Sequence, residues 1–158
     1  MISYFDLRDL SVEKLLHAWR WLCPEDFQLV AINAFGDLFL ENKQGAILQL
    51  DVAAGTLSPI SDSLAEFKSL ATSPEKQKIC FHSDLEAQLE RNGFRLCEKQ
   101  CFGYKIPAVF KESATIVDNV YIADMYEYVS FLGDLHEQLR DRADGAKVRI
   151  DIRPRPRA

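Results

Sequence analysis

The stretch that decides the fold is "NAFGDLFLENKQGAILQLDVAAGTL", residues 33–57. Before the turn sequence "NKQG", apolar and polar residues alternate. Leu38 and Leu40 fall on one side of an extended strand, and Asp37 and Glu41 fall on the other. The alternation predicts the first arm of an antiparallel hairpin whose polar side faces solvent.

The second arm repeats the pattern in the opposite direction of the chain. Its inward residues are Leu48, Leu50 and Val52, and its outward residues are Gln49 and Asp51. The turn sequence "AAGTL" then leads into "TLSPI", a short third strand whose proline is suited to an edge or an end.

Helical spacing of apolar residues appears on both sides of this hairpin. Capping residues at Ser11, Ser63 and Ser83 mark three helix starts, the last two as capping boxes with Glu66 and Glu86. The helices predicted from these signals cover residues 11–22, 63–71, 83–93 and 127–142. A β-branched and aromatic stretch precedes the last helix, and "AKVRIDI" (146–152) predicts a final strand.

The order of these elements favours an α+β fold with a mainly antiparallel sheet, packed by an N-terminal helix and by C-terminal helices. The chain has 158 residues, which fits a single domain, and we place this domain at residues 1–152. Residues 153–158 form a basic tail in which arginine and proline alternate, a composition typical of an extended, solvated terminus.

Composition bears on several classes of function. The formal net charge is −5, and the basic residues cluster only at the C-terminus, so direct nucleic-acid binding is not expected. No apolar run approaches the ~20 residues of a membrane helix. The N-terminus lacks the basic and apolar regions of a signal peptide, which predicts a cytoplasmic protein without membrane attachment.

Metal and nucleophile motifs are also missing. The best set of metal ligands would be Cys80, His82, Cys97 and Cys101, but the paired C-x₂-C spacing of structural zinc sites is absent. The sequence has no G-x-S-x-G elbow and no glycine-rich phosphate loop. We therefore predict no catalytic residue, no metal and no cofactor, and a protein that is not an enzyme.

One alternative, the small-ligand hypothesis, stays open beside this interpretation: a small-ligand-binding or regulatory module. It places a cleft near Tyr104, Lys105 and His136, with Asp118 and Asn119 as further lining residues. His136 also lies on the apolar side of its predicted helix, where a hydrogen-bonded core histidine is the more common role.

Three sequence blocks resemble a known family. They are "NAFGDLFLENKQGAILQLDVAAGTLSPISDS" (33–63), "CFGYKIPAVF" (101–110) and "VDNVYIADMYEYVSFLGDLHEQLRDRADGAKV" (117–148). Together they resemble the C-terminal domain family of type VI secretion DNase-immunity proteins, formerly a domain of unknown function and often joined to a GAD-like domain. The resemblance covers roughly residues 30–148. Here an N-terminal helix stands in place of a GAD-like domain.

The resemblance implies a cytoplasmic antitoxin that binds and blocks a cognate secreted effector, such as a nuclease. Blocking a nuclease requires a rigid surface that complements a basic substrate groove. The acidic residues predicted to face outward on the hairpin, Asp37, Glu41 and Asp51, are the candidates for partner binding.

The same resemblance makes "CFGYKIP" a turn-and-strand connector of the scaffold. Gly103 would supply a backbone angle that other residues avoid, and Pro107 would fix the exit of the chain. Cys97 and Cys101 would then be packing groups.

Overall fold

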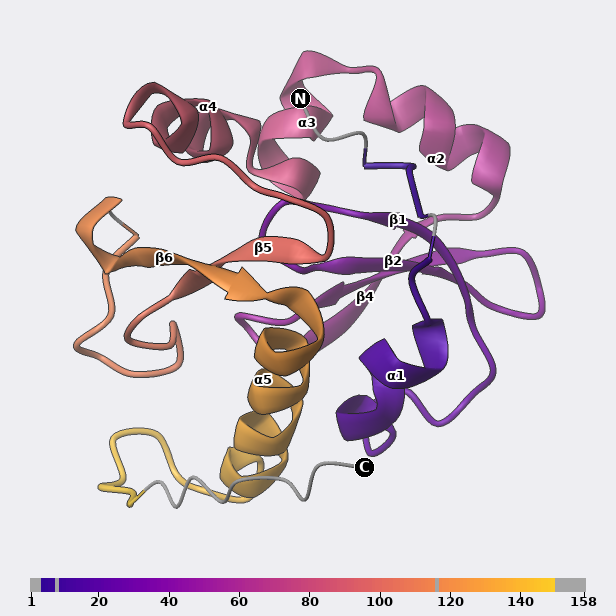
Figure 1. Cartoon of the computed structure of the whole chain (residues 1–158). Helices are drawn as coiled ribbons and strands as arrows, with labels where there is room; N and C mark the ends of the chain where they lie inside the picture. Colours follow the sequence, from indigo (N-terminus) through magenta and orange to yellow (C-terminus); the bar gives the residue numbers. More distant parts are fainter. Residues whose placement is uncertain (1–3, 8, 116, 150–158) are drawn as a thin grey trace.

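The structure is a computed structural model of the chain that describes residues 4–7, 9–115 and 117–149. Its strands form two antiparallel sheets, and its helices lie on both sides of the larger one, which confirms the α+β class (Figure 1). The elements in chain order are α1 (Val12–Leu16), η1 (His17–Trp19), β1 (Gln28–Ile32), β2 (Leu38–Glu41), β3 (Ile47–Asp51), β4 (Thr56–Ser61), α2 (Leu64–Ala71), α3 (Pro74–Phe81), α4 (Ser83–Arg91), β5 (Gln100–Tyr104), η2 (Val117–Asn119), β6 (Val120–Asp124) and α5 (Met125–Leu139). The predicted basic tail, 153–158, lies outside the described residues.

The larger sheet is a meander in the order β1-β2-β3-β4. Leu38 pairs with Leu50 and Leu40 with Leu48, so the predicted antiparallel hairpin is confirmed, with these four leucines on one side. Its turn is closed by Asn42, whose side-chain oxygen accepts hydrogen bonds from the backbone N–H groups of Gln44 and Ala46. The short strand predicted at "TLSPI" is β4.

The prediction of one solvent-facing side of this sheet is wrong. Leu38 and Leu50 face α1, η1 and α5, whereas Phe39 and Ile47 on the opposite side are buried against Phe67 of α2 and its neighbours on α3. Figure 1 shows α2, α3 and α4 on one side of the sheet and α1 and α5 on the other. The sheet is therefore the middle layer of three.

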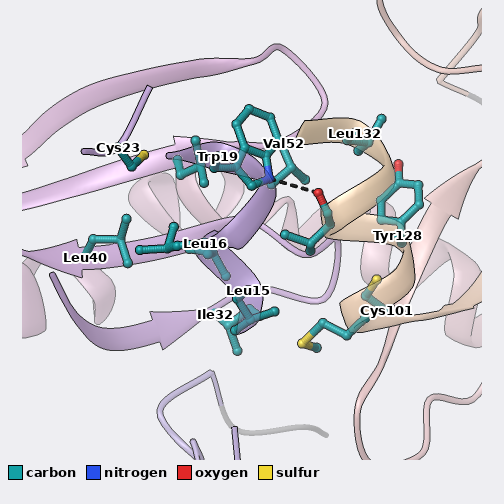
Figure 2. Close-up of a cluster of buried hydrophobic side chains, with 14 of the residues drawn as sticks. Leu15, Leu16, Trp19, Cys23, Ile32, Leu40, Val52, Cys101, Tyr128 and Leu132 are labelled. Carbon is teal, nitrogen blue, oxygen red and sulfur yellow. Dashed lines mark hydrogen bonds between the residues drawn. The ribbon is translucent and has the colours of Figure 1, made fainter. Parts of the chain in front are cut away.

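The main core lies between the sheet and the helices α1 and α5. Trp19 is fully buried there, and its Nε1 donates a hydrogen bond of 2.8 Å to the carbonyl of Val129 in α5 (Figure 2). Cys23 and Cys101 reach the same core as buried free thiols.

The helix starts agree with the sequence in two of three cases. The Ser11 and Ser63 side chains accept hydrogen bonds from the N–H groups of Lys14 and Glu66, which confirms both N-caps. The first helix is shorter than predicted, because it tightens into the 3₁₀ turn η1 after Leu16.

The third predicted cap, at Ser83, is wrong. Ser83 is already the first residue of α4, and the cap position belongs to His82, which adopts a left-handed backbone with φ 52°. His82 also ends α3, a helix that the sequence analysis did not predict. One residue thus turns the chain between two consecutive helices.

The second sheet consists of β5 and β6, and α5 follows β6 directly. Gly103 in β5 does not need an unusual backbone angle, so that prediction is wrong. Its missing Cβ matters instead, because a Cβ there would lie 2.8 Å from the Tyr128 ring and 2.9 Å from the Tyr121 ring. Cys101 packs in the core as predicted, whereas Cys97 is exposed.

The final predicted strand is not formed where it can be checked. Residues 146–149 have no regular structure, and the rest of the predicted strand, 150–152, lies outside the described residues. Across the described part of the chain, no helix combines the length and apolar character needed to cross a membrane.

Candidate functional site

The three hairpin carboxylates that the sequence groups together have different surroundings. Glu41 and Asp51 are half-buried at opposite ends of the hairpin, whereas Asp37 is only 2% exposed. The prediction that Asp37 faces outward is wrong. Its side of the sheet was assigned correctly, but the layer of α2, α3 and α4 covers that side.

Asp37 is held by a dense set of donors. Its Oδ2 accepts a 2.8 Å hydrogen bond from Asn33 Nδ2, and its Oδ1 accepts a 3.0 Å bond from the Val52 N–H. The side-chain amide of Gln49 lies 3.5 Å from Oδ2. Such an arrangement compensates the carboxylate for the water it loses on burial.

A histidine completes the surroundings of this carboxylate. His82 Nε2 lies 3.5 Å from Asp37 Oδ2, and the His82 side chain remains 40% exposed. The hydrogen bond to Asp37 is the main reason that the pKa of His82 is raised, and burial opposes it. Burial, with the nearby Asp37 charge as the second cause, raises the pKa of Asp51.

Two aromatic rings lie beside this ion pair. The Phe35 ring meets His82 edge-on at 5.4 Å and stacks with Tyr104 at 6.3 Å between ring centroids. Burial, with Asp37 and Asp51 as lesser causes, raises the pKa of Tyr104 to about 12. Tyr104 therefore stays protonated near neutral pH, and the titratable group of the cluster is His82.

The Asp37–His82 contact joins the helical layer to the sheet. Asn33 adds a second link, because its Nδ2 also donates a 3.0 Å hydrogen bond to the Cys80 carbonyl at the end of α3. Sequence reasoning missed this contact, since the two residues are far apart and neither belongs to a spaced motif. The only sequence signal was a histidine just before a predicted helix.

The residues of the small-ligand hypothesis divide into two places. Asn119 and Lys105 lie together at one end of the β5–β6 sheet, where the Lys105 ammonium donates to the Asp118 carbonyl. Tyr104 ends β5 beside them. His136 instead lies within 3.1 Å of the Ala53 carbonyl on the far side of the main core, which is the core role considered from the sequence.

The side chain of Asn119 is fully occupied by structural contacts. Its Oδ1 accepts from the Ile106 N–H, and its Nδ2 donates to the carbonyls of Ile106 and Ala114. These bonds close the loop between β5 and β6. Asn119 thus shapes the backbone and has little capacity left for a ligand.

Glu41 borders an open cleft at the end of the hairpin. The cleft has a volume of about 530 Å³, and Asp26 and Glu41 supply its two carboxylates. Its cation is Lys43, whose ammonium is 4.0 Å from Asp26 while both side chains are largely exposed, 72% and 90%. An ion pair this exposed contributes little and separates easily.

The four sulfur and imidazole ligands considered for zinc do not form a site. Cys101 is buried in the main core and Cys97 is exposed, while His82 is engaged with Asp37. Across residues 4–7, 9–115 and 117–149, no group of three or more histidine, cysteine or acidic side chains is placed to bind a metal ion.

Comparison with known proteins identifies no relative of this chain. The chain matches no model of a known protein family, and a search of curated proteins finds no significant match.

Proposed function

We propose that this chain is a non-catalytic, cytoplasmic binding protein of the immunity type, which neutralises a cognate secreted toxin such as a nuclease. The observation that carries the proposal is the open cleft bordered by Asp26 and Glu41. The resemblance of residues 30–148 to DNase-immunity proteins supplies the class of partner.

The chemistry of the cleft suits a basic partner. A nuclease binds phosphates with lysine and arginine, so its substrate groove carries positive charge. An arginine from that groove could take the place of Lys43 beside Asp26 and reach Glu41 as well. The net charge of −5 adds long-range attraction, which speeds the encounter of oppositely charged proteins.

The first test is co-expression with the product of the neighbouring reading frame. We expect that product to be toxic alone, to be tolerated when this chain is present, and to co-purify with it. If neither neighbouring product is toxic, or if a toxic product is not rescued, the proposed function is refuted.

A second test addresses the cleft. The double substitution Asp26→Lys and Glu41→Lys should slow association with the toxin by more than about tenfold at low salt, with a smaller effect at high salt. The matched control reverses the exposed Glu90 of α4 and Glu137 of α5, which changes the net charge equally. Equal loss in both double variants would mean that general charge, and not the cleft, attracts the toxin.

A further inference from the structure

Four hydrogen bonds fix which backbone groups of β6 face its partner strand β5. Antiparallel pairs alternate between residues that bond each other and residues whose N–H and C=O groups point away from each other. Phe102, which pairs with Ile122, sends its N–H to the Ala34 carbonyl, away from β6. Tyr104, which pairs with Val120, sends its N–H to the Tyr128 hydroxyl.

The two ends of the ladder agree with this alternation. The Lys105 N–H donates to the Asn119 carbonyl, and the Met125 N–H donates to the Lys99 carbonyl, so both pairs are of the bonded kind. It follows that the Val120 C=O, both backbone groups of Ile122 and the Asp124 N–H point to the outer edge of β6. The Val120 N–H belongs to the last turn of η2, and the Asp124 C=O lies at the N-cap of α5.

Nothing in the described part of the chain pairs with this outer edge. β6 has β5 as its only neighbour in the sheet, and Figure 1 shows it as the outermost strand on its side of the molecule. The edges of the larger sheet differ. The Ile32 N–H at the edge of β1 donates to the Tyr4 carbonyl, and β4 contains Pro59, a residue that discourages further pairing.

The same edge is apolar. Tyr121 and Ile122 are 39% and 38% exposed, although they point to opposite sides of the strand. Ile106 and Val109, in the loop that leads toward β6, are also exposed, so four of the six large hydrophobic side chains exposed on the described residues belong to this region. The sequence of β6 contains neither lysine nor proline, the usual protection of an edge strand.

Exposed carboxylates stand at both ends of the strand. Asp118 precedes β6 and Asp124 ends it, and the carbonyl of Asp118 already holds the nearby Lys105 ammonium. A segment that pairs along this edge therefore meets apolar side chains in its middle and negative charge at its ends.

We propose that the outer edge of β6 is a second docking surface, which takes an extended segment of a partner protein as an added antiparallel strand. The segment carries apolar residues in its middle and a basic residue near each end. Main-chain hydrogen bonds to Val120, Ile122 and Asp124 provide the pairing, and the exposed side chains of Tyr121 and Ile122 provide selectivity. This surface is separate from the hairpin cleft and does not depend on the toxin proposal.

The test uses the full chain and a labelled synthetic peptide in which valine and threonine alternate between two terminal lysines. We expect saturable binding by fluorescence anisotropy, with amide chemical-shift changes centred on residues 120–124. Methylating the backbone nitrogens of the peptide that face β6 should weaken binding at least about tenfold, because it removes donors without changing the side chains. Replacing both lysines by glutamates should weaken it by a similar factor.

Two protein variants check the location. Ile122→Pro removes an N–H that β5 does not use, so the β5–β6 ladder should survive while peptide binding falls at least about tenfold. Ile79→Thr, at an isoleucine on α3 that is even more exposed than Ile122, should leave binding unchanged. Because proline at 122 could still unfold the strand, its thermal melting is measured alongside, and Asp118→Lys provides a milder second variant with the same expected direction.

Several results would overturn the proposal. They are an absence of peptide binding, binding that tolerates N-methylation and Ile122→Pro alike, and equal binding of the lysine and glutamate peptides. A dimer of the chain that sedimentation detects and that Ile122→Pro dissociates would also overturn it, since the occupant of the edge would then be a second copy.

Discussion

The substitution Asp37→Asn tests the contact between the sheet and the helical layer. It keeps the size of the side chain but replaces one oxygen by an NH₂ group, which must face either the Asn33 amide or the Val52 N–H. One of the two short bonds, 2.8 and 3.0 Å, is then lost. Either the Val52 N–H is left buried without a partner, or Asn33 Nδ2 keeps only its bond to the Cys80 carbonyl. A hydrogen bond to a charged group contributes about 1.5–3 kcal/mol, and an unpaired buried donor adds to the loss, so we expect about 3 kcal/mol.

Urea unfolding followed by tryptophan fluorescence measures this loss directly. The midpoint should fall while the slope stays unchanged, because the buried surface is the same. Asp26→Asn is the control, since that side chain is 90% exposed and its replacement should cost less than about 0.5 kcal/mol. A loss below about 1 kcal/mol for Asp37→Asn would refute the reasoning that the buried carboxylate is needed.

The same variant has a signature in the pH dependence of stability. The pKa of His82 lies above 6.5 in the folded state, chiefly because of Asp37. Folding therefore favours the protonated ring, and the stabilisation from His82 is complete below pH 6.5 and is lost as the pH rises through the raised pKa. In Asp37→Asn this decline above pH 6.5 should become smaller.

His136 acts in a different pH window and with the opposite sign. Burial lowers its pKa below 6.5, so its stabilising contribution grows as the pH rises toward 6.5. This rise should persist in Asp37→Asn. Asparagine tolerates the left-handed backbone at position 82. In His82→Asn the decline in stability above pH 6.5 should therefore also become smaller, while the rise toward pH 6.5 should remain. A decline that is unchanged in both variants would show that His82 is not its source.

Two further predictions concern the β5–β6 unit. Gly103→Ala should lower the free energy of unfolding by about 1–3 kcal/mol, because the added Cβ would press on the rings of Tyr121 and Tyr128. Urea unfolding measures this loss. An unchanged free energy of unfolding would mean that both rings move aside freely. Asn119→Ala removes the bonds that close the adjoining loop, so limited proteolysis with mass spectrometry should find faster cleavage within residues 106–114, and equal rates would contradict that role.

Local patterns predicted the local structure well. The alternation from Leu38 to Val52 predicted the hairpin and the side on which its leucines lie, and the caps at Ser11 and Ser63 marked true helix starts. Each of these signals depends on residues a few positions apart. The interpretation of Gly103 failed for a related reason, because the rings that require a glycine there come from β6 and α5.

The helix α3 explains the largest error. Its sequence "PEKQKICF" has no apolar stripe, and Ile79 points into solvent at 58% exposure. Only Cys80 and Phe81 at its end join the buried cluster that Phe39, Ile47 and Phe67 form on this side of the sheet. A helix that contributes so few buried residues leaves almost no periodic signal, and without this helix the sequence predicts a sheet with one side open to solvent.

Because the helices α2, α3 and α4 cover one side of the sheet, carboxylates that look alike in the sequence have different roles. Asp37 lies under the α3–α4 junction and is committed to Asn33, Val52 and His82, so its substitution should act on folding. Glu41 lies beyond the helices at the hairpin cleft, where its reversal should act on association and leave stability nearly unchanged. Measuring both quantities for both positions separates these roles. If Glu41→Lys destabilises the fold as much as Asp37→Asn does, the helical layer does not define which acidic residues remain available to a partner.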